Sequence, residues 1–301
     1  MMSKVLSSSQ IEQFIEMGYV KVEEAYPRKF ALTAQDRLWE RLEREGIDRQ
    51  DRSTWTEPLI SIQEHYSSEE FHRCSTRRLA DAVKDLIGVG RLKDWQVYGD
   101  DGSSTKWGWW PVNFSLGADQ PWTVPHEGWH WDGQNFRHYV DAPNQGLLCL
   151  CLFSDIGPRG GGTLVVEGSH KPVASYLQQY PEGIELGPAI REFRGKHKYW
   201  VELCRPFEAT EKVALERVER FMNTSYIDEN GFHLKVVETT GQAGDVFLCH
   251  PFLFHAPSQN HSGVPRFMCN RVSPLEERMR LQRKNKADYS PLELSIRNSI
   301  F

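Results

Sequence analysis

The apolar positions in the first third of the chain recur at helical spacing, with one alternating segment between them. Residues 8–17 (SSQIEQFIEM) place two isoleucines and Phe14 on one face behind a serine cap, which predicts a short amphipathic helix. The following GYVKVEEAY alternates like a strand. Further helices are predicted over about 29–46 and over 69–88, each ending at a glycine.

From about residue 95, short apolar runs separated by glycine, proline and aspartate replace the helical pattern. Several such runs with turns between them are typical of a β sandwich or barrel. The predicted strands are KDWQVYG (93–99), WGWWPVNFSLG (107–117), QGLLCLCLFSDI (145–156), GTLVVEGSH (162–170), FHLKVVETT (232–240), GDVFLCHPFLFHA (244–256) and RFMCNRVSP (266–274).

One domain over residues 1–301 fits this pattern. It would consist of a helical part at about 1–94 and a β core at about 95–274, followed by a charged tail over 275–301 that is predicted to be helical at first. Helical periodicity returns within the core at 171–222, in KPVASYLQQY and EATEKVALERVERFM. We therefore expect a mainly β fold with N-terminal helices and a helical insertion between two strands.

Composition and charge narrow the function. The 36 basic and 41 acidic residues give a net charge of −5 without a long basic run, so a nucleic-acid partner is not indicated. No apolar stretch reaches the ~18 residues of a membrane span, and the N-terminus shows no apolar signal region. The six cysteines are scattered without a CxxC pair, which predicts reduced thiols. These features predict a cytoplasmic protein.

Two distant segments carry metal-ligand chemistry. In PHEGWHWDG (125–133), His130 and Asp132 lie two residues apart, so both point to one side of an extended segment. The second segment carries His250 and His255 near the end of a predicted strand, in GDVFLCHPFLFHAPSQNHSGVPR (244–266). One distant histidine completes a two-histidine, one-carboxylate triad that leaves a metal face open, as in iron(II) oxygenases. Zinc enzymes use similar ligands, so the triad alone does not fix the metal.

Arg266 separates these possibilities. It lies 11 residues after His255, at the start of the next predicted strand. A guanidinium there suits a bidentate bond with a carboxylate in a dry pocket, and 2-oxoglutarate needs such an anchor while its keto acid chelates the metal. Taken alone, Arg266 is equally compatible with a surface position.

Together these motifs resemble the phytanoyl-CoA dioxygenase superfamily of iron(II)- and 2-oxoglutarate-dependent oxygenases. The matching segments are SSSQIEQFIEMGYVKVEEAY (7–26), HWD (130–132), GGGTLVVEGSH (160–170), GDVFLCHPFLFHAPSQN (244–260) and Arg266. The resemblance implies a double-stranded β-helix (jelly-roll, cupin-like) core, with His130, Asp132 and His255 as Fe²⁺ ligands and Arg266 binding 2-oxoglutarate. It also implies a hydroxylation or similar oxidation of a small molecule by O₂, with release of succinate and CO₂.

Three further residues are candidate contacts of the cosubstrate. The family often has a hydroxyl residue two positions after the distal histidine, where this chain has Pro257, with Ser258 one step later. Thr163 and Asn113 are further candidate contacts. Related halogenases replace the metal carboxylate with a small residue, so the presence of Asp132 favours hydroxylation.

Several alternatives stay open. His126 and His250 are competing histidines, which we expect to be second-shell, packed or surface groups because the prolines and glycines around them break regular spacing. The chain is alternatively a cupin-like metal enzyme without 2-oxoglutarate, or a non-enzymatic metal-dependent sensor or binding module. Tryptophans concentrated between Trp107 and Trp131 either fill the core or favour a partly apolar substrate. The sequence does not indicate the oligomeric state.

Overall fold

The computed structural model describes residues 4–93 and 107–301. The strand predicted over 93–99 lies outside these residues, apart from Lys93. The strands form two sheets, with orders β1-β8-β4-β10-β3-β2 and β6-β7-β5-β9. Their bounds are β1 Tyr19–Val22, β2 Leu59–Ile62, β3 Trp110–Asn113, β4 Leu148–Leu152, β5 Leu164–Glu167, β6 Tyr226–Ile227, β7 His233–Glu238, β8 Val246–Cys249, β9 His255–Ala256 and β10 Arg266–Val272.

All neighbouring strands within these sheets pair antiparallel. The predicted strand 244–256 is in fact two strands, β8 and β9, which lie in different sheets. Hydrogen bonding among the described residues does not close the two sheets into a barrel. This arrangement of two antiparallel sheets agrees with the predicted jelly-roll class.

Alternation along β4 shows how the sheets face each other. Leu148, Leu150 and Leu152 share one apolar cluster with Val165 of β5, so this face of the larger sheet packs against the smaller sheet. Cys149 and Cys151 point to the opposite face and belong to the main core cluster. The interior between the sheets is therefore lined by every second residue of each strand.

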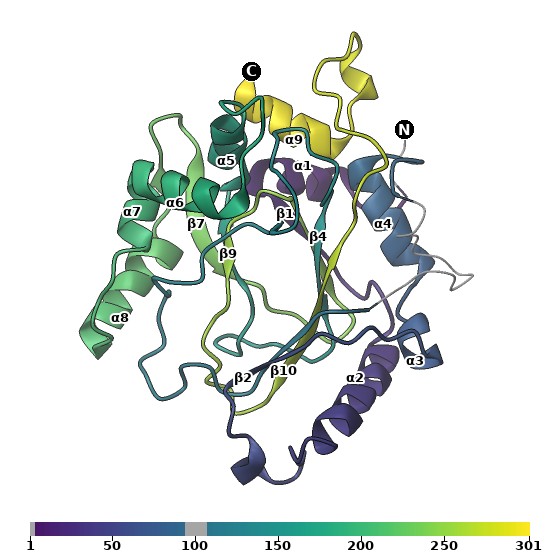
Figure 1. The fold of residues 1–301 in the computed structure, drawn as a ribbon, viewed down its shortest axis with the longest axis vertical. Helices are drawn as coiled ribbons and strands as arrows, with labels where there is room; N and C mark the ends of the chain where they lie inside the picture. The colour runs from purple at the N-terminus through teal and green to yellow at the C-terminus, as the bar shows by residue number, and fades with distance from the viewer. Residues whose placement is uncertain (1–3, 94–106) are drawn as a thin grey trace.

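Helices cover the outside of the sheets. In Figure 1, α6, α7 and α8 lie together on the side of β7, and α2, α3 and α4 lie on the opposite side of the molecule. The helices are α1 Ser8–Met17, α2 Arg28–Glu43, α3 Glu69–His72, α4 Arg77–Ile87, α5 His170–Leu177, α6 Leu186–Lys196, α7 Lys198–Leu203, α8 Glu211–Val218 and α9 Pro291–Ile300. No helix of the described chain is long and apolar enough to span a membrane.

Two helix predictions need correction. The helix predicted over 69–88 is broken into α3 and α4, because Thr76 accepts a hydrogen bond from the Leu79 backbone N–H and so caps a new helix. The tail is not helical at its start. Its helix, α9, begins only at Pro291, where the Ser290 side chain caps the first turn and proline occupies the first helical position.

The tryptophans mainly pack the core. Trp107 and Trp110 both contact Phe153 edge-on, with ring centroids 5.2 and 4.9 Å apart, and both are fully buried. Trp129 and Trp131 are also fully buried, whereas 42% of Trp109 is exposed. The core-filling interpretation therefore fits most of this cluster, and only Trp109 offers a large exposed ring.

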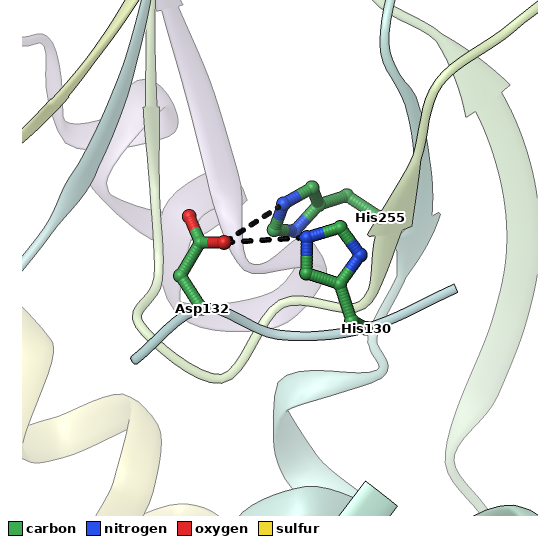
Figure 2. A group of neighbouring side chains, drawn as sticks. All are labelled: His130, Asp132 and His255. Carbon is green, nitrogen blue, oxygen red and sulfur yellow. Dashed lines mark ion pairs between the residues drawn. The ribbon is translucent and has the colours of Figure 1, made fainter. Parts of the chain in front are cut away.

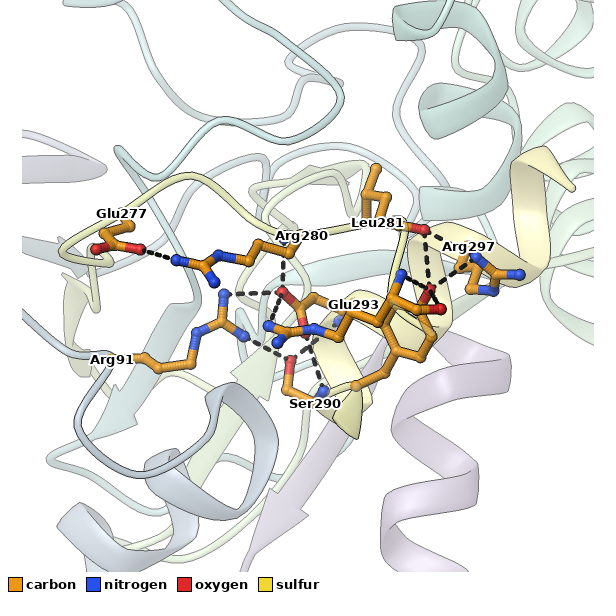
Figure 3. Close-up of polar contacts among 9 residues, drawn as sticks. Arg91, Glu277, Arg280, Leu281, Ser290, Glu293 and Arg297 are labelled. Carbon is orange, nitrogen blue, oxygen red and sulfur yellow. Dashed lines mark hydrogen bonds and ion pairs between the residues drawn. The ribbon is translucent and has the colours of Figure 1, made fainter. Parts of the chain in front are cut away.

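A buried carboxylate fixes α9 to the rest of the fold (Figure 3). Glu293 is fully buried and accepts from Arg91 Nη2 at 2.9 Å and from Arg283 Nη2 at 3.2 Å. The backbone N–H groups of Arg280 and Ser290 also donate to it. Burial alone would raise the pKa of Glu293, but these N–H donors and guanidinium charges outweigh it and lower the pKa.

Glu293→Ala should lower the free energy of unfolding by about 3 kcal/mol, because it leaves the guanidinium groups without their shared partner. Since the folded-state pKa is lowered, the contribution of Glu293 is present at neutral pH and is lost as the pH falls through that pKa. Urea denaturation at two pH values measures both effects. Glu277, which pairs with Arg280 on the surface, is the matched control and should tolerate alanine. Equal loss in both variants would contradict this role.

Candidate metal centre

The two triad histidines are direct neighbours across a pair of extended segments. The His130 N–H donates to the His255 carbonyl at 3.0 Å, and the His255 N–H donates back to the His130 carbonyl at 2.8 Å. Through this isolated bridge, the segment that carries His130 lies beside β9, at the edge of the smaller sheet. Asp132 follows two residues after His130 and returns to the same side, as the alternation predicts.

The three side chains converge on one point (Figure 2). Asp132 Oδ1 lies 3.3 Å from His130 Nε2 and 3.6 Å from His255 Nε2. One ligand atom from each residue falls within 4.8 Å of the others, and no other such cluster of metal-binding side chains occurs in the described part of the chain. Two imidazole nitrogens and a carboxylate oxygen are a donor set that fits iron(II).

Backbone carbonyls fix the orientation of both imidazole rings. His130 Nδ1 donates to the Gly128 carbonyl at 2.6 Å, and His255 Nδ1 donates to the Leu253 carbonyl at 3.0 Å. A carbonyl can only accept, so the proton sits on Nδ1 and the Nε2 lone pair is left free for a metal. Residue spacing alone does not reveal these carbonyl contacts, and Gly128, two positions before His130, is the one signal of them in the sequence.

The electrostatics of the triad favour an ionised carboxylate. Burial would raise the pKa of Asp132, but the charges and hydrogen bonds of His255 and His130 outweigh it and lower the pKa. For His255, burial lowers the pKa, while the neighbouring Asp132 carboxylate more than compensates and raises it. His130 is the most exposed of the three, with 36% of its side chain accessible, so the centre opens to solvent on that side.

The competing histidines lie elsewhere. His126 contacts the Phe207 ring and lies 3.5 Å from Glu127 Oε1. His250 is fully buried against His170, with ring centroids 4.7 Å apart, and its Nδ1 accepts from the Phe252 N–H. Neither joins the triad, which agrees with their predicted packed or surface positions.

Arg266 is buried between the sheets, not on the surface. It lies on the same face of β10 as Met268, which belongs to the cluster between the sheets. Arg266 Nη1 donates to the Pro111 carbonyl at 3.2 Å, while its buried Nε has no acceptor among the described residues. Burial lowers the pKa of Arg266 to about 10, and no carboxylate of residues 4–93 or 107–301 offsets it. An orphaned, buried guanidinium N–H fits an anionic ligand.

The other candidate cosubstrate contacts already have protein partners. Asn113, opposite Arg266 in register, donates to the Ser258 carbonyl at 2.9 Å and accepts from the Leu116 N–H. The Ser258 hydroxyl donates its only proton to the Gly162 carbonyl, so it can only accept from a ligand. The Thr163 hydroxyl lies 3.6 Å from Met268 Sδ and therefore faces the interior. Thr163 is thus the best placed of the three.

Comparison with known proteins agrees with this geometry. The family model described as phytanoyl-CoA dioxygenase matches residues 14–268. The chain belongs to this family. Membership confirms the enzyme class predicted from the sequence, an iron(II)- and 2-oxoglutarate-dependent dioxygenase. No curated protein shows a significant match in sequence.

Solved structures in this class are similar only at a distance. EctD from S. alaskensis, solved with 2-oxoglutarate and 5-hydroxyectoine, is 17% identical, with a TM-score of 0.46 over 90% of this chain and 76% of its own. HygX from Streptomyces hygroscopicus, solved with nickel and 2-oxoglutarate, is 15% identical, with a TM-score of 0.43 over 88% and 85%. The carbocyclase SnoK from nogalamycin biosynthesis is 14% identical, with a TM-score of 0.48 over 90% and 84%.

Proposed function

We propose that this dioxygenase oxidises a partly apolar small molecule, with His130, Asp132 and His255 holding iron(II) and Arg266 anchoring 2-oxoglutarate. The observation that carries this assignment is the pairing of an oriented triad with a buried guanidinium that has no anionic partner among the described residues. A cupin-like enzyme without 2-oxoglutarate, or a metal-dependent sensor, would have no use for that guanidinium.

Each protein group has a definite task in this proposal. The carbonyls of Gly128 and Leu253 hold the imidazole protons on Nδ1, so both rings present Nε2. Arg266 binds the distal carboxylate of 2-oxoglutarate and so fixes which end reaches the triad. When bound, iron(II) supplies the activation of O₂ that couples oxidation of 2-oxoglutarate to succinate and CO₂ with oxidation of the substrate.

The apolar wall between the sheets has a separate role. Leu150, Val165 and Met268 are all buried in it, which keeps bulk water away from the reacting groups. A site with such walls favours a substrate that is at least partly apolar. It also strengthens the charge-assisted bonds that Arg266 makes with a ligand.

Succinate formation tests this function. Protein loaded with iron(II) and supplied with 2-oxoglutarate, O₂ and a pool of cell metabolites should form succinate above the level of an Asp132→Asn variant. That variant keeps the size of the side chain and removes its charge, so it controls for contaminating oxygenases. Loaded protein that neither binds 2-oxoglutarate nor forms succinate would contradict the assignment.

A further inference from the structure

The inner face of β10 carries a polar side chain that has no task in the proposed function. Asn270 lies four residues after Arg266 and on the same face of the strand, about 13 Å farther along it. Leu150 lies opposite Asn270 in register and belongs to the apolar cluster between the sheets. Asn270 therefore places an amide next to the apolar side chains between the sheets.

The amide of Asn270 is incompletely satisfied. Its Oδ1 is buried and has no hydrogen-bond partner among the described residues, although the side chain as a whole is only partly buried. An unpaired buried carbonyl costs free energy that a donor from a bound molecule would recover. The side chains of Leu150 and the other leucines of this cluster have no hydrogen-bond donor, so Asn270 Oδ1 is available to a donor of a bound molecule.

Asn270 lies on the triad side of Arg266. Leu253, whose carbonyl accepts from His255 Nδ1, belongs to the same buried apolar cluster as Cys249, the last residue of β8. Cys249 pairs with Leu148, which in turn pairs with Val272. Asn270 lies two residues before Val272 on β10. It therefore lies between Arg266, the proposed cosubstrate anchor, and the end of β10 that is nearest to the metal centre.

A partly exposed aromatic side chain, Trp109, neighbours Asn270. The backbone N–H of Asn270 donates to the carbonyl of Trp109, the residue before β3, at 3.0 Å. Alternation counted from the pair of Arg266 and Asn113 puts the side chains of Asn270 and Trp109 on one face. Trp109 Nε1 donates to Ser61 Oγ at 2.8 Å, which fixes the indole while leaving 42% of the residue exposed. The neighbouring Trp110 points to the opposite face and is fully buried in the core.

We propose that Asn270 and Trp109 together bind and orient the substrate, and that this substrate is a ring compound bearing a hydroxyl group. The hydroxyl would donate to Asn270 Oδ1, and the apolar face of the ring would stack on the Trp109 indole. This inference rests on the proposed function, because it assigns the substrate class of the same site.

The test compares two panels of small molecules. One contains hydroxylated rings, namely methyl glucosides, cyclitols, alicyclic alcohols and phenols. The other contains linear fatty acids and acyl-CoA thioesters of similar apolar content. Calorimetric titration into anaerobic protein loaded with metal and 2-oxoglutarate gives Kd, and 2-oxoglutarate consumption in air gives KM and kcat. Binders should come from the first panel.

The variants then locate the contact. Asn270→Leu and Trp109→Ala should each weaken the best binder at least about tenfold, or ~1.4 kcal/mol, and raise its KM. Trp109→Phe should keep most of the affinity because it retains a ring. Affinity for 2-oxoglutarate and for the metal should change by less than about twofold, since neither residue contacts them in this proposal.

The inference is overturned if no hydroxylated ring binds, if only the second panel binds, or if the best binder ignores both variants. Its failure is distinguishable from failure of the proposed function, which would appear as loss of 2-oxoglutarate binding by the wild type. In that case the ring compounds are titrated into metal-free protein. A binder that is weakened by Asn270→Leu there would still support the contact, and an unaffected one would exclude it.

Discussion

His255→Ala is expected to abolish stoichiometric iron(II) binding and, with it, succinate formation. The His255 imidazole is the least exposed ligand, with 6% of its side chain accessible, and two remaining ligands hold the ion poorly. Even loss of an outer-shell partner typically costs 10–100-fold in metal affinity, so loss of a ligand should cost more than about 100-fold. His130→Ala and Asp132→Ala should have the same outcome, measured by metal analysis after gel filtration and by anaerobic titration.

The histidines outside the triad provide matched controls. His126→Ala should keep full iron stoichiometry, because its contacts are with Phe207 and Glu127. His250→Ala should also bind iron, although its stability should fall because the ring is fully buried. Iron binding that survives in one triad variant and is lost in one control would force a reassignment of the ligands.

The sequence could predict that His130, Asp132 and His255 are candidate ligands, and the structure brings their side chains together. The H-x-D pair depends only on alternation, and His255 is placed by the short strand that carries it. What the sequence could not give is the reciprocal backbone pairing of His130 and His255, since it joins segments more than 120 residues apart. That pairing, rather than the spacing, brings the two Nε2 atoms to one carboxylate.

Errors arose where tertiary contacts override periodicity. The apolar pattern over 69–88 is continuous, yet Thr76 starts a new helix through its side-chain cap. The sequence predicts a helix at the start of the charged tail, yet the helix begins only at Pro291, where Glu293 is buried against Arg91 from a distant segment. A partner far along the chain leaves no periodic signal, so neither feature could be predicted from pattern alone.

The tryptophans illustrate the same limit at the site. Trp109 and Trp110 are adjacent in sequence, yet Trp109, just before β3, is 42% exposed, whereas Trp110, the first residue of β3, is fully buried in the core. Composition suggested a partly apolar substrate from the whole cluster. The structure restricts that argument to Trp109, because alternation turns its neighbour into the core.

Arg266→Met is expected to weaken 2-oxoglutarate binding by roughly tenfold to a few hundredfold. A charge-assisted, desolvated hydrogen bond contributes about 1.5–3 kcal/mol, and ~1.4 kcal/mol corresponds to one decade in Kd. Methionine keeps a long unbranched side chain and removes the charge, so it leaves a smaller cavity than alanine would and the loss reports mainly on the guanidinium. Arg266→Lys should recover only part of the affinity, because a point charge lacks the planar fork. Calorimetric titration of 2-oxoglutarate into anaerobic, metal-loaded protein measures the affinity of the wild type and of both variants.

Without 2-oxoglutarate, Arg266→Met should not lose thermal stability. The Arg266 guanidinium is buried with no carboxylate to balance it in the part of the chain that the structure describes, and burial lowers its pKa to about 10. Removing an uncompensated buried cation should leave the melting temperature of the ligand-free protein unchanged or raised, whereas 2-oxoglutarate should stabilise the wild type alone. Iron affinity should stay unchanged, since a guanidinium donates hydrogen bonds and does not ligate a cation. Equal 2-oxoglutarate affinity in wild type and Arg266→Met would remove the anchor and most of the case for this cosubstrate site.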